Sequence, residues 1–288
     1  MIIDSHAHFE PRMLTEADLL QKINESGVNK VALIPAMNDP LPHTPELLLS
    51  IMRVIMQNGF TRPLADLVHR FTLSKDGNLV LEGQEYGIYP FPDNQAVASL
   101  VEKYPDTFLG WIFLNPKNNS KVLDDLEKWR SIKGMIGVKL HPHWHDYSVD
   151  LLWPVFARCQ ELNLPVLIHL GFGQNGNFQA ILEHFPNLKM IAAHAGFPFY
   201  QDLWKFSKDY PNLHVDLSSP YIDEHLASLS IKHMGAERCL YGTDSPYGFQ
   251  DDNQSYDYNE IKNWILRNNL TDNENKAIFS ENFLRLTS

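Results

Sequence analysis

The chain has 288 residues, of which 44% are hydrophobic and 20% are charged, so it can bury one large core or two smaller ones. Its formal net charge of −11, without any basic stripe, argues against a nucleic-acid partner because a phosphate backbone would be repelled. No stretch approaches the roughly 18 uncharged apolar residues of a membrane span, so a membrane partner is not expected either.

Short apolar runs alternate with helix-length amphipathic segments along most of the chain, which is the pattern of βα units around a parallel sheet. Parallel strands are buried on both faces and therefore read as continuous apolar runs. We predict eight strands, at Met1–His6, Lys30–Ala36, Phe108–Leu114, Gly134–His141, Pro165–Leu170, Lys189–His194, Leu213–Leu217 and Cys239–Thr243. Helices are predicted at Asp150–Leu162, Gly176–Phe185, Phe199–Tyr210 and Ile222–Met234. The final segment, Ser255–Leu286, is predicted to form one or two helices that close a (β/α)8 TIM barrel.

One segment, Asn38–Asp93, breaks this rhythm and is far longer than an ordinary loop. It contains several prolines, a predicted helix at Pro45–Gly59 and a turn at Lys75–Asn78. Active sites of such barrels are built from the loops that follow the strands, so an insertion after the second strand is expected to lie over the substrate. The alternative is a stabilising flap without substrate contact. Either way, residues 1–288 are read as a single domain with an insertion.

Two histidines end the first predicted strand, in Asp4-Ser5-His6-Ala7-His8. Side chains of a strand alternate with a period of two, so His6 and His8 project to the same side and could chelate one metal ion. Taken alone this pair is a weak signal, because a histidine at a strand end often only bonds a loop.

Three further strands end on residues of the same chemistry, namely His169, His194 and Asp244. The carboxyl ends of barrel strands converge on one mouth, where barrel enzymes keep their active sites. Imidazole and carboxylate together suit zinc, and a catalytic site leaves one coordination position open for water. We therefore predict metal ligands at His6, His8, His169 and Asp244. His194 would then face the water or a substrate oxygen, and Asp244 would also accept a proton as the water attacks.

The fourth strand ends in Lys139-Leu-His141-Pro142-His143-Trp-His145. Lys139 has three candidate roles: a cation that holds a substrate anion, a carbamylated bridge between two metals, or a structural partner of a buried carboxylate. Pro142 is expected to end the strand, with His141 pointing into the mouth. The other two histidines are placed in the following loop, as surface residues or as ligands.

The ordered motifs resemble the amidohydrolase superfamily, and most of all its amidohydrolase-2 branch. They are His6-Ala-His8, Gly-Val-Lys139-Leu-His141-Pro, His169, Ala-His194-Ala-Gly, Gly-Thr-Asp244-Ser-Pro and a tail with Asn282-Phe-Leu-Arg-Leu.

The resemblance implies a distorted barrel whose metal ligands are His6, His8, His169 and Asp244, with His194 near the water or substrate. Members like this one hold a single metal, often zinc, so we expect one zinc, with manganese or another divalent ion as alternatives and no second metal. The Lys-x-His-Pro pattern departs from binuclear relatives with a carbamylated lysine, which puts Lys139 in doubt as a bridge.

Hydrolysis of a small lactone, ester or amide is the leading functional prediction. The branch also contains non-oxidative decarboxylases related to aminocarboxymuconate-semialdehyde decarboxylase, and its metal motifs do not separate the two reactions. Arginines bind carboxylates, and Arg53, Arg62 and Arg70 lie in the insertion, which motivates the decarboxylase alternative. A barrel that binds a metal or ligand without catalysis is the third hypothesis.

Substrate contacts are predicted for Lys139, His141, Arg53 and three loop aromatics, Trp144, Phe172 and Tyr247. The partner is expected to be a small molecule, and a homodimer is admissible. The amino terminus lacks the basic and apolar regions of a signal peptide, and Cys159 and Cys239 lie in apolar contexts typical of reduced thiols. A cytoplasmic location is therefore expected.

Overall fold

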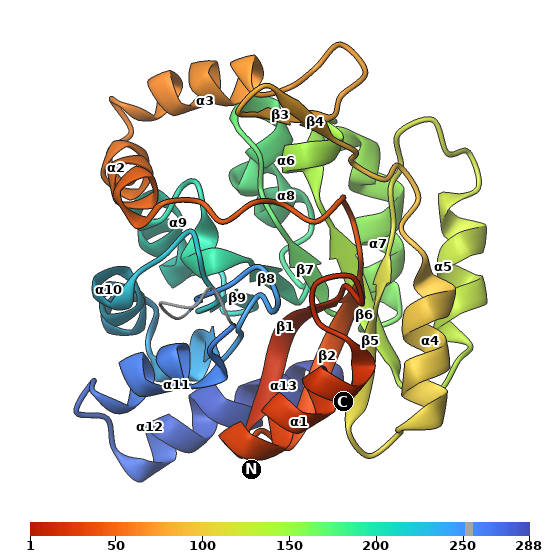
Figure 1. Ribbon diagram of the computed structural model, residues 1–288, viewed down its shortest axis with the longest axis vertical. Coiled ribbons are helices and arrows are strands. Elements are labelled where there is room, and N and C mark those ends of the chain that lie inside the picture. The colour runs from red at the N-terminus through yellow and green to blue at the C-terminus, as the bar shows by residue number, and fades with distance from the viewer. Residues whose placement is uncertain (251–255) are drawn as a thin grey trace.

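The computed structural model describes residues 1–250 and 256–288 and contains the predicted parallel ring of eight strands (Figure 1). In order around the ring these are β1 (Ile3–Phe9), β2 (Lys30–Pro35), β5 (Phe108–Phe113), β6 (Met135–Leu140), β7 (Val166–Ile168), β8 (Met190–Ala192), β9 (Leu213–Asp216) and β10 (Cys239–Leu240). The ring closes where the residues after β10 return to β1, since Ala7 bridges Ser245 in parallel and Thr243 N donates to His6 O at 3.1 Å. The predicted TIM barrel is therefore confirmed.

Helices on the outside of the ring follow the strands and shield their apolar faces. They are α1 (Glu16–Ser26), α4 (Asn94–Lys103), α5 (Val122–Arg130), α7 (Trp153–Glu161), α8 (Phe178–His184), α9 (Gln201–Phe206), α10 (Glu224–Met234) and α11 (Tyr258–Leu266). Short 3-10 turns lie at Val149–Leu152, Gly173–Gly176, His194–Gly196, Ser207–Asp209 and Ala236–Arg238. The bounds of helix α1 follow from its local sequence. At its start the Thr15 side chain accepts a hydrogen bond from the Asp18 amide, and at its end Gly27 adopts a left-handed conformation with φ 70°.

The carboxyl-terminal segment closes the bottom of the barrel. After α11 it runs through α12 (Asp272–Lys276), a π turn (Ala277–Glu281) and α13 (Asn282–Thr287) without interruption. Phe283 of α13 meets the buried Trp111 ring edge-on inside the barrel, with 6.3 Å between the ring centroids. Gly137 makes room for this indole, because a Cβ there would come within 2.6 Å of it. This end of the barrel is therefore filled by side chains, and the candidate site lies at the opposite end.

The insertion after β2 forms two helices and a hairpin. The predicted helix is α2 (Glu46–Gln57), and the predicted turn lies where Ser74 and Asn78 bond before the hairpin of β3 (Leu79–Leu81) and β4 (Gln84–Tyr86). Helix α3 (Arg62–Phe71) was not expected from the sequence. Figure 1 shows α2 and α3 at the outer edge of the molecule. No helix within residues 1–250 and 256–288 is long and apolar enough to cross a membrane.

Candidate active site

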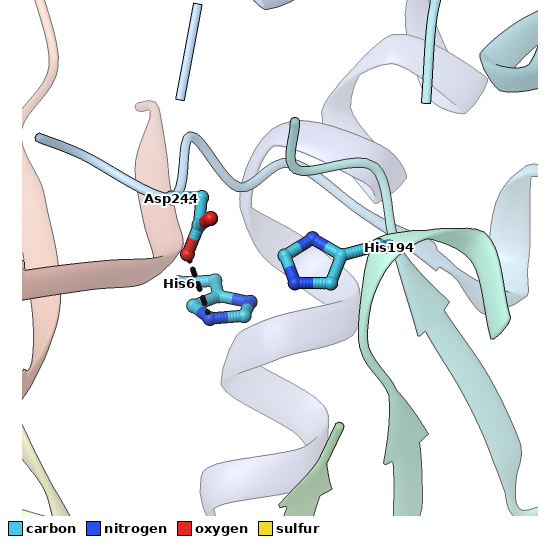
Figure 2. A group of neighbouring side chains, drawn as sticks. All are labelled: His6, His194 and Asp244. Carbon is cyan, nitrogen blue, oxygen red and sulfur yellow. Dashed lines mark ion pairs between the residues drawn. The ribbon is translucent and has the colours of Figure 1, made fainter. Parts of the chain in front are cut away.

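Three side chains from different strand ends face one another at the mouth of the barrel (Figure 2). His6, His194 and Asp244 each offer one ligand atom, and these atoms all lie within 4.8 Å of one another. His6 Nε2 lies 3.3 Å from Asp244 Oδ1, and His8 Nε2 approaches the same oxygen at 3.2 Å. A carboxylate that faces several imidazole nitrogens is a donor set suited to a divalent ion.

Asp216, at the end of β9, determines how His6 is turned. Its Oδ2 lies 2.9 Å from His6 Nδ1, which leaves Nε2 directed at Asp244. Its Oδ1 accepts the backbone amides of His194 and Ser218, each at 3.0 Å. Burial raises the pKa of Asp216, but the neighbouring His6 and His194 outweigh burial and hold that pKa below its usual value. Asp216 therefore orients a candidate ligand, as carboxylates behind metal-bound histidines do.

His194 and Asp244 share an unusual backbone conformation. Their φ angles are 52° and 56°, in the left-handed region that side chains other than glycine adopt at a cost. His194 Nδ1 lies 2.8 Å from Ser218 Oγ and 3.2 Å from the Ser218 carbonyl. A proton on Nδ1, donated to that carbonyl, leaves the Nε2 lone pair free.

His169 has a buried nitrogen without a partner. Its Nδ1 lies 3.2 Å from the Leu170 carbonyl, whereas Nε2 has no hydrogen-bond partner among the described residues. Its ring centroid is 4.9 Å from that of His194. An unpaired nitrogen at this depth costs free energy unless something binds it. A metal ion bound by this Nε2 fits that observation.

Lys139 is fully buried beside the same cluster. Its Nζ lies 3.3 Å from His6 Nε2, and burial lowers its pKa to about 8. No carboxylate of the described residues lies within ion-pair distance of Nζ. Asp244 and Asp216 act on the Lys139 amine only through longer-range attraction, which partly offsets the effect of burial on its pKa. Of its predicted roles, the first two require an amine that is free to react or to bind an anion.

A cavity of about 60 Å³ opens on these side chains. Of the predicted substrate contacts, Lys139, His141, Trp144 and Tyr247 line it. Phe172 instead lines a larger outer hollow of about 750 Å³, and the two spaces share the Trp144 side chain. Leu41 of the insertion also lines the inner cavity.

The three arginines of the insertion do not line the inner cavity. Arg53 is buried but lies behind the wall, where it bonds the Pro220 carbonyl at 2.9 Å and pairs with Glu46 at 2.5 Å. Arg62 pairs with Asp202, and Arg70 pairs with Asp66 of its own helix at the outer hollow. The prediction of Arg53 as a direct substrate contact is therefore wrong, because α2 places its guanidinium against a backbone carbonyl.

The histidines after β6 are neither surface residues nor in a loop. Pro142 ends the strand as predicted and begins a short helix, α6 (Pro142–His145). His141 caps this helix, and its Nδ1 accepts a hydrogen bond from the Trp144 amide. His143 stacks between His69 of α3 and His169, with ring centroids 4.1 and 5.1 Å away. His145 Nε2 lies 2.9 Å from the Tyr89 carbonyl. Of the two alternatives predicted for His143 and His145, surface residues or ligands, the first is wrong, because the insertion covers both side chains.

The family model described as amidohydrolase matches residues 3–286. The chain belongs to the amidohydrolase family. This family is metal-dependent, which agrees with the donor set of His6, His194 and Asp244. No curated protein matches the chain.

Solved structures of other proteins share the fold of this amidohydrolase. The 4-oxalomesaconate hydratase of Rhodopseudomonas palustris has a TM-score of 0.66 at 16% identity, over 100% of this chain and 95% of that one. The 5-carboxyvanillate decarboxylase of Sphingomonas paucimobilis has a TM-score of 0.61 at 14% identity, over 99% and 98%. A dihydroxybenzoic acid decarboxylase of Polaromonas sp. JS666, with bound manganese, has a TM-score of 0.61 at 16% identity, over 99% and 96%. At these identities the likeness concerns the fold alone.

Among the residues that sequence reasoning missed are Asp216, which contacts His6, and His69, which stacks on His143. Asp216 ends an apolar strand just as His169 and Asp244 do, so the rule that found those residues would also have found it. His69 carried no such signal, because its position depends on how α3 folds back over the barrel. The assignment of individual ligands remains a prediction.

Proposed function

We propose that this amidohydrolase hydrolyses a small lactone, ester or amide with the help of one divalent metal ion. The observation that carries the proposal is the convergence of His194 and Asp244, both in left-handed backbone conformations, on the nitrogens of His6 and His8. Residues held at such a cost commonly serve a mechanism, and these two can move protons.

The residues fit a metal ion. We assign it to His6, His8, His169 and Asp244, with zinc as the first choice and manganese as the alternative found in the Polaromonas structure. The unpaired His169 Nε2 and the turned His6 ring support this set. When bound, the ion would acidify a water molecule and polarise the substrate carbonyl.

The chain's own groups supply the remaining chemistry. Asp244 accepts the proton of the attacking water, as a carboxylate beside an activated water molecule can. His194 Nε2 faces the same space, and its free lone pair can accept a hydrogen bond from the attacking water or from a substrate hydroxyl group. Trp144 and Tyr247 form apolar walls, so the inner cavity suits a compact and partly apolar substrate.

Lys139 favours a substrate that carries an anionic group. Its buried amine faces the cavity without a carboxylate partner among the described residues, and an anion would supply one. The same observation supports a second candidate reaction, non-oxidative decarboxylation. The two decarboxylases named above act on aromatic acids, and in this chain Lys139 would hold the substrate carboxylate.

Elemental analysis of purified protein tests the metal assignment. We expect about one zinc or manganese per chain in the wild type, its loss in His169→Ala and its retention in His184→Ala, a surface histidine of α8. Metal-free wild type that binds no added divalent ion, or a His169→Ala variant with full metal content, would contradict the assignment.

Two activity assays on the metal-loaded enzyme separate the reactions. A panel of lactones, esters and amides reports hydrolysis, and carbon dioxide release from aromatic and unsaturated acids reports decarboxylation. Turnover of a lactone or ester, lost in Asp244→Asn, supports the proposed reaction. Carbon dioxide release without hydrolysis replaces it with the second candidate.

A further inference from the structure

Apolar side chains gather on the outer surface of the insertion. Among the described residues, nine of the fifteen exposed large hydrophobic side chains lie between positions 47 and 71: Leu47, Leu48, Ile51, Val54, Phe60, Leu64, Leu67, Val68 and Phe71. We call these nine side chains the apolar patch. Phe60, in the link between α2 and α3, is 91% exposed, and Phe71 at the end of α3 is 79% exposed. Figure 1 places both helices at the edge of the molecule.

The orientation of α3 is the reverse of an ordinary surface helix. Its polar residues Asp66, His69 and Arg70 line the outer hollow above the site. Its apolar residues at i, i+3, i+4 and i+7, from Leu64 to Phe71, are exposed, and the helix has no fully buried residue. A surface helix normally turns such an apolar face toward a core. The hollow occupies the inner side, so the face of this helix is available to another molecule.

Helix α2 is apolar on two sides. Leu49 and Met56 are buried against the molecule, whereas Leu47, Ile51 and Val54 are exposed on the other side. A helix that is apolar all round is usually buried all round. The outer side of α2 therefore continues the apolar surface of α3, which it contacts.

The extent of the apolar patch matches a protein interface. At their exposed fractions the nine side chains present on the order of 1,000 Å², since one aromatic side chain alone offers about 150–250 Å². The largest patch on a typical monomer is about 300–600 Å². A stable interface buries about 800 Å² on each partner. The apolar patch is thus larger than the typical patch on a monomer, and it is large enough to supply one side of a stable interface.

The charges around the apolar patch select the partner. Each arginine of α2 and α3 is already paired within the chain: Arg53 with Glu46, Arg62 with Asp202 and Arg70 with Asp66. These helices thus offer no free cation to lipid head groups or phosphates, and the chain as a whole carries −11. A second copy needs no charge complement, because an apolar surface related by a twofold axis is complementary to itself.

We propose that the apolar patch is the dimer interface of this protein, with α2 and α3 of two copies packed on each other. This contact between two copies would also stabilise the loop at Pro220, which forms part of the active-site wall. Arg53 links α2 to the carbonyl of Pro220, which lines the inner cavity, so a partner seated on α2 restrains this loop from behind.

The test compares two charge-matched double variants by sedimentation velocity across a concentration series. Leu64→Glu with Leu67→Glu alters residues of the apolar patch that are 52% and 50% exposed. Leu151→Glu with Leu266→Glu alters residues elsewhere that are 50% and 55% exposed. Far-ultraviolet circular dichroism verifies that all proteins are folded, and hydrogen exchange of α3 amides gives a second readout.

We expect the wild type and the Leu151/Leu266 variant to sediment as dimers of 33.2 kDa chains. The Leu64/Leu67 variant should be monomeric, with its dimer dissociation constant raised roughly a hundredfold or more and α3 exchanging faster. A monomeric wild type, or a Leu64/Leu67 variant that stays dimeric, overturns the proposal. Binding of monomeric wild type to anionic lipid vesicles would assign the apolar patch to a membrane surface instead.

Discussion

Three histidine rings at the mouth are each oriented by a hydrogen bond on the nitrogen that points away from the cavity. His6 is fixed by Asp216, His194 by Ser218 and His169 by the Leu170 carbonyl. In each case one nitrogen is occupied and the other faces the cavity. Such partners raise the basicity of a ligand and remove its rotational freedom before a metal arrives.

Asp216→Asn tests this role at the level of a single residue. The amide keeps the shape of the side chain but removes the charge beside His6 Nδ1, so we expect metal affinity to fall by about 10–100-fold. Competition with a chromogenic chelator measures the affinity. The exposed Asp209→Asn is the control and should bind metal as the wild type does. Equal affinities in both variants would show that Asp216 has no such role.

At the scale of elements, the site depends on where strands end and on what closes the ring. The last strand, β10, has only two residues, Cys239 and Leu240, so its position relies on support from elsewhere. Asn282 at the start of α13 provides this support: its amide donates to the carbonyls of Ala236 and Cys239 at 2.7 and 2.8 Å. The Asn-x-x-Arg-Leu motif of the tail is thus a structural link between α13 and the strand that leads to Asp244.

Asn282→Ala should lower the free energy of unfolding by about 2–4 kcal/mol, because two buried carbonyls lose their donor. Urea unfolding measures the change. Asn273→Ala, at an exposed position of α12, serves as control and should stay within about 0.5 kcal/mol of the wild type. A loss in Asn282→Ala no larger than in this control would exclude the proposed link.

At the scale of the whole molecule, buried histidines make stability depend on pH. Burial lowers the pKa of His8 to about 3 and those of His194 and His214 to about 4. In the unfolded chain these groups titrate near 6.5. At a pH between the folded and the unfolded pKa of such a histidine, the unfolded chain binds more protons than the folded one. The free energy of unfolding therefore decreases as the pH falls from about 6.5 to about 4.

His214→Gln isolates one of these contributions away from the metal cluster. Burial, aided by Arg285 and Arg238, keeps the folded imidazole neutral. From pH 7 to 4.5 the metal-free wild type should lose about 2–3 kcal/mol more stability than the variant, which cannot take up this proton on unfolding. Urea unfolding at both pH values measures this difference. The exposed His225→Gln should follow the wild type, and a His214→Gln variant that also does so would refute the assignment.

The sequence by itself determined the barrel and its mouth. Buried parallel strands can be recognised as apolar runs, and polar residues at the ends of these runs, such as His169 and Asp244, stand out against the apolar residues before them. The period of two along a strand then placed His6 and His8 on one side without reference to any distant residue.

Only the tertiary structure decided how these residues meet. The bond between His6 and Asp216 joins positions 210 residues apart, and it forms because the ring closes. The position of Arg53 is also decided by a distant contact. Its guanidinium donates a hydrogen bond to the Pro220 carbonyl, 167 residues away, and does not enter the mouth. The outward orientation of the apolar face of α3 could not be predicted from its sequence pattern either. Periodicity shows that a helix has an apolar and a polar face, but not which of them packs against the protein. Local sequence specifies elements and their ends, whereas contacts between distant elements depend on packing of the whole chain.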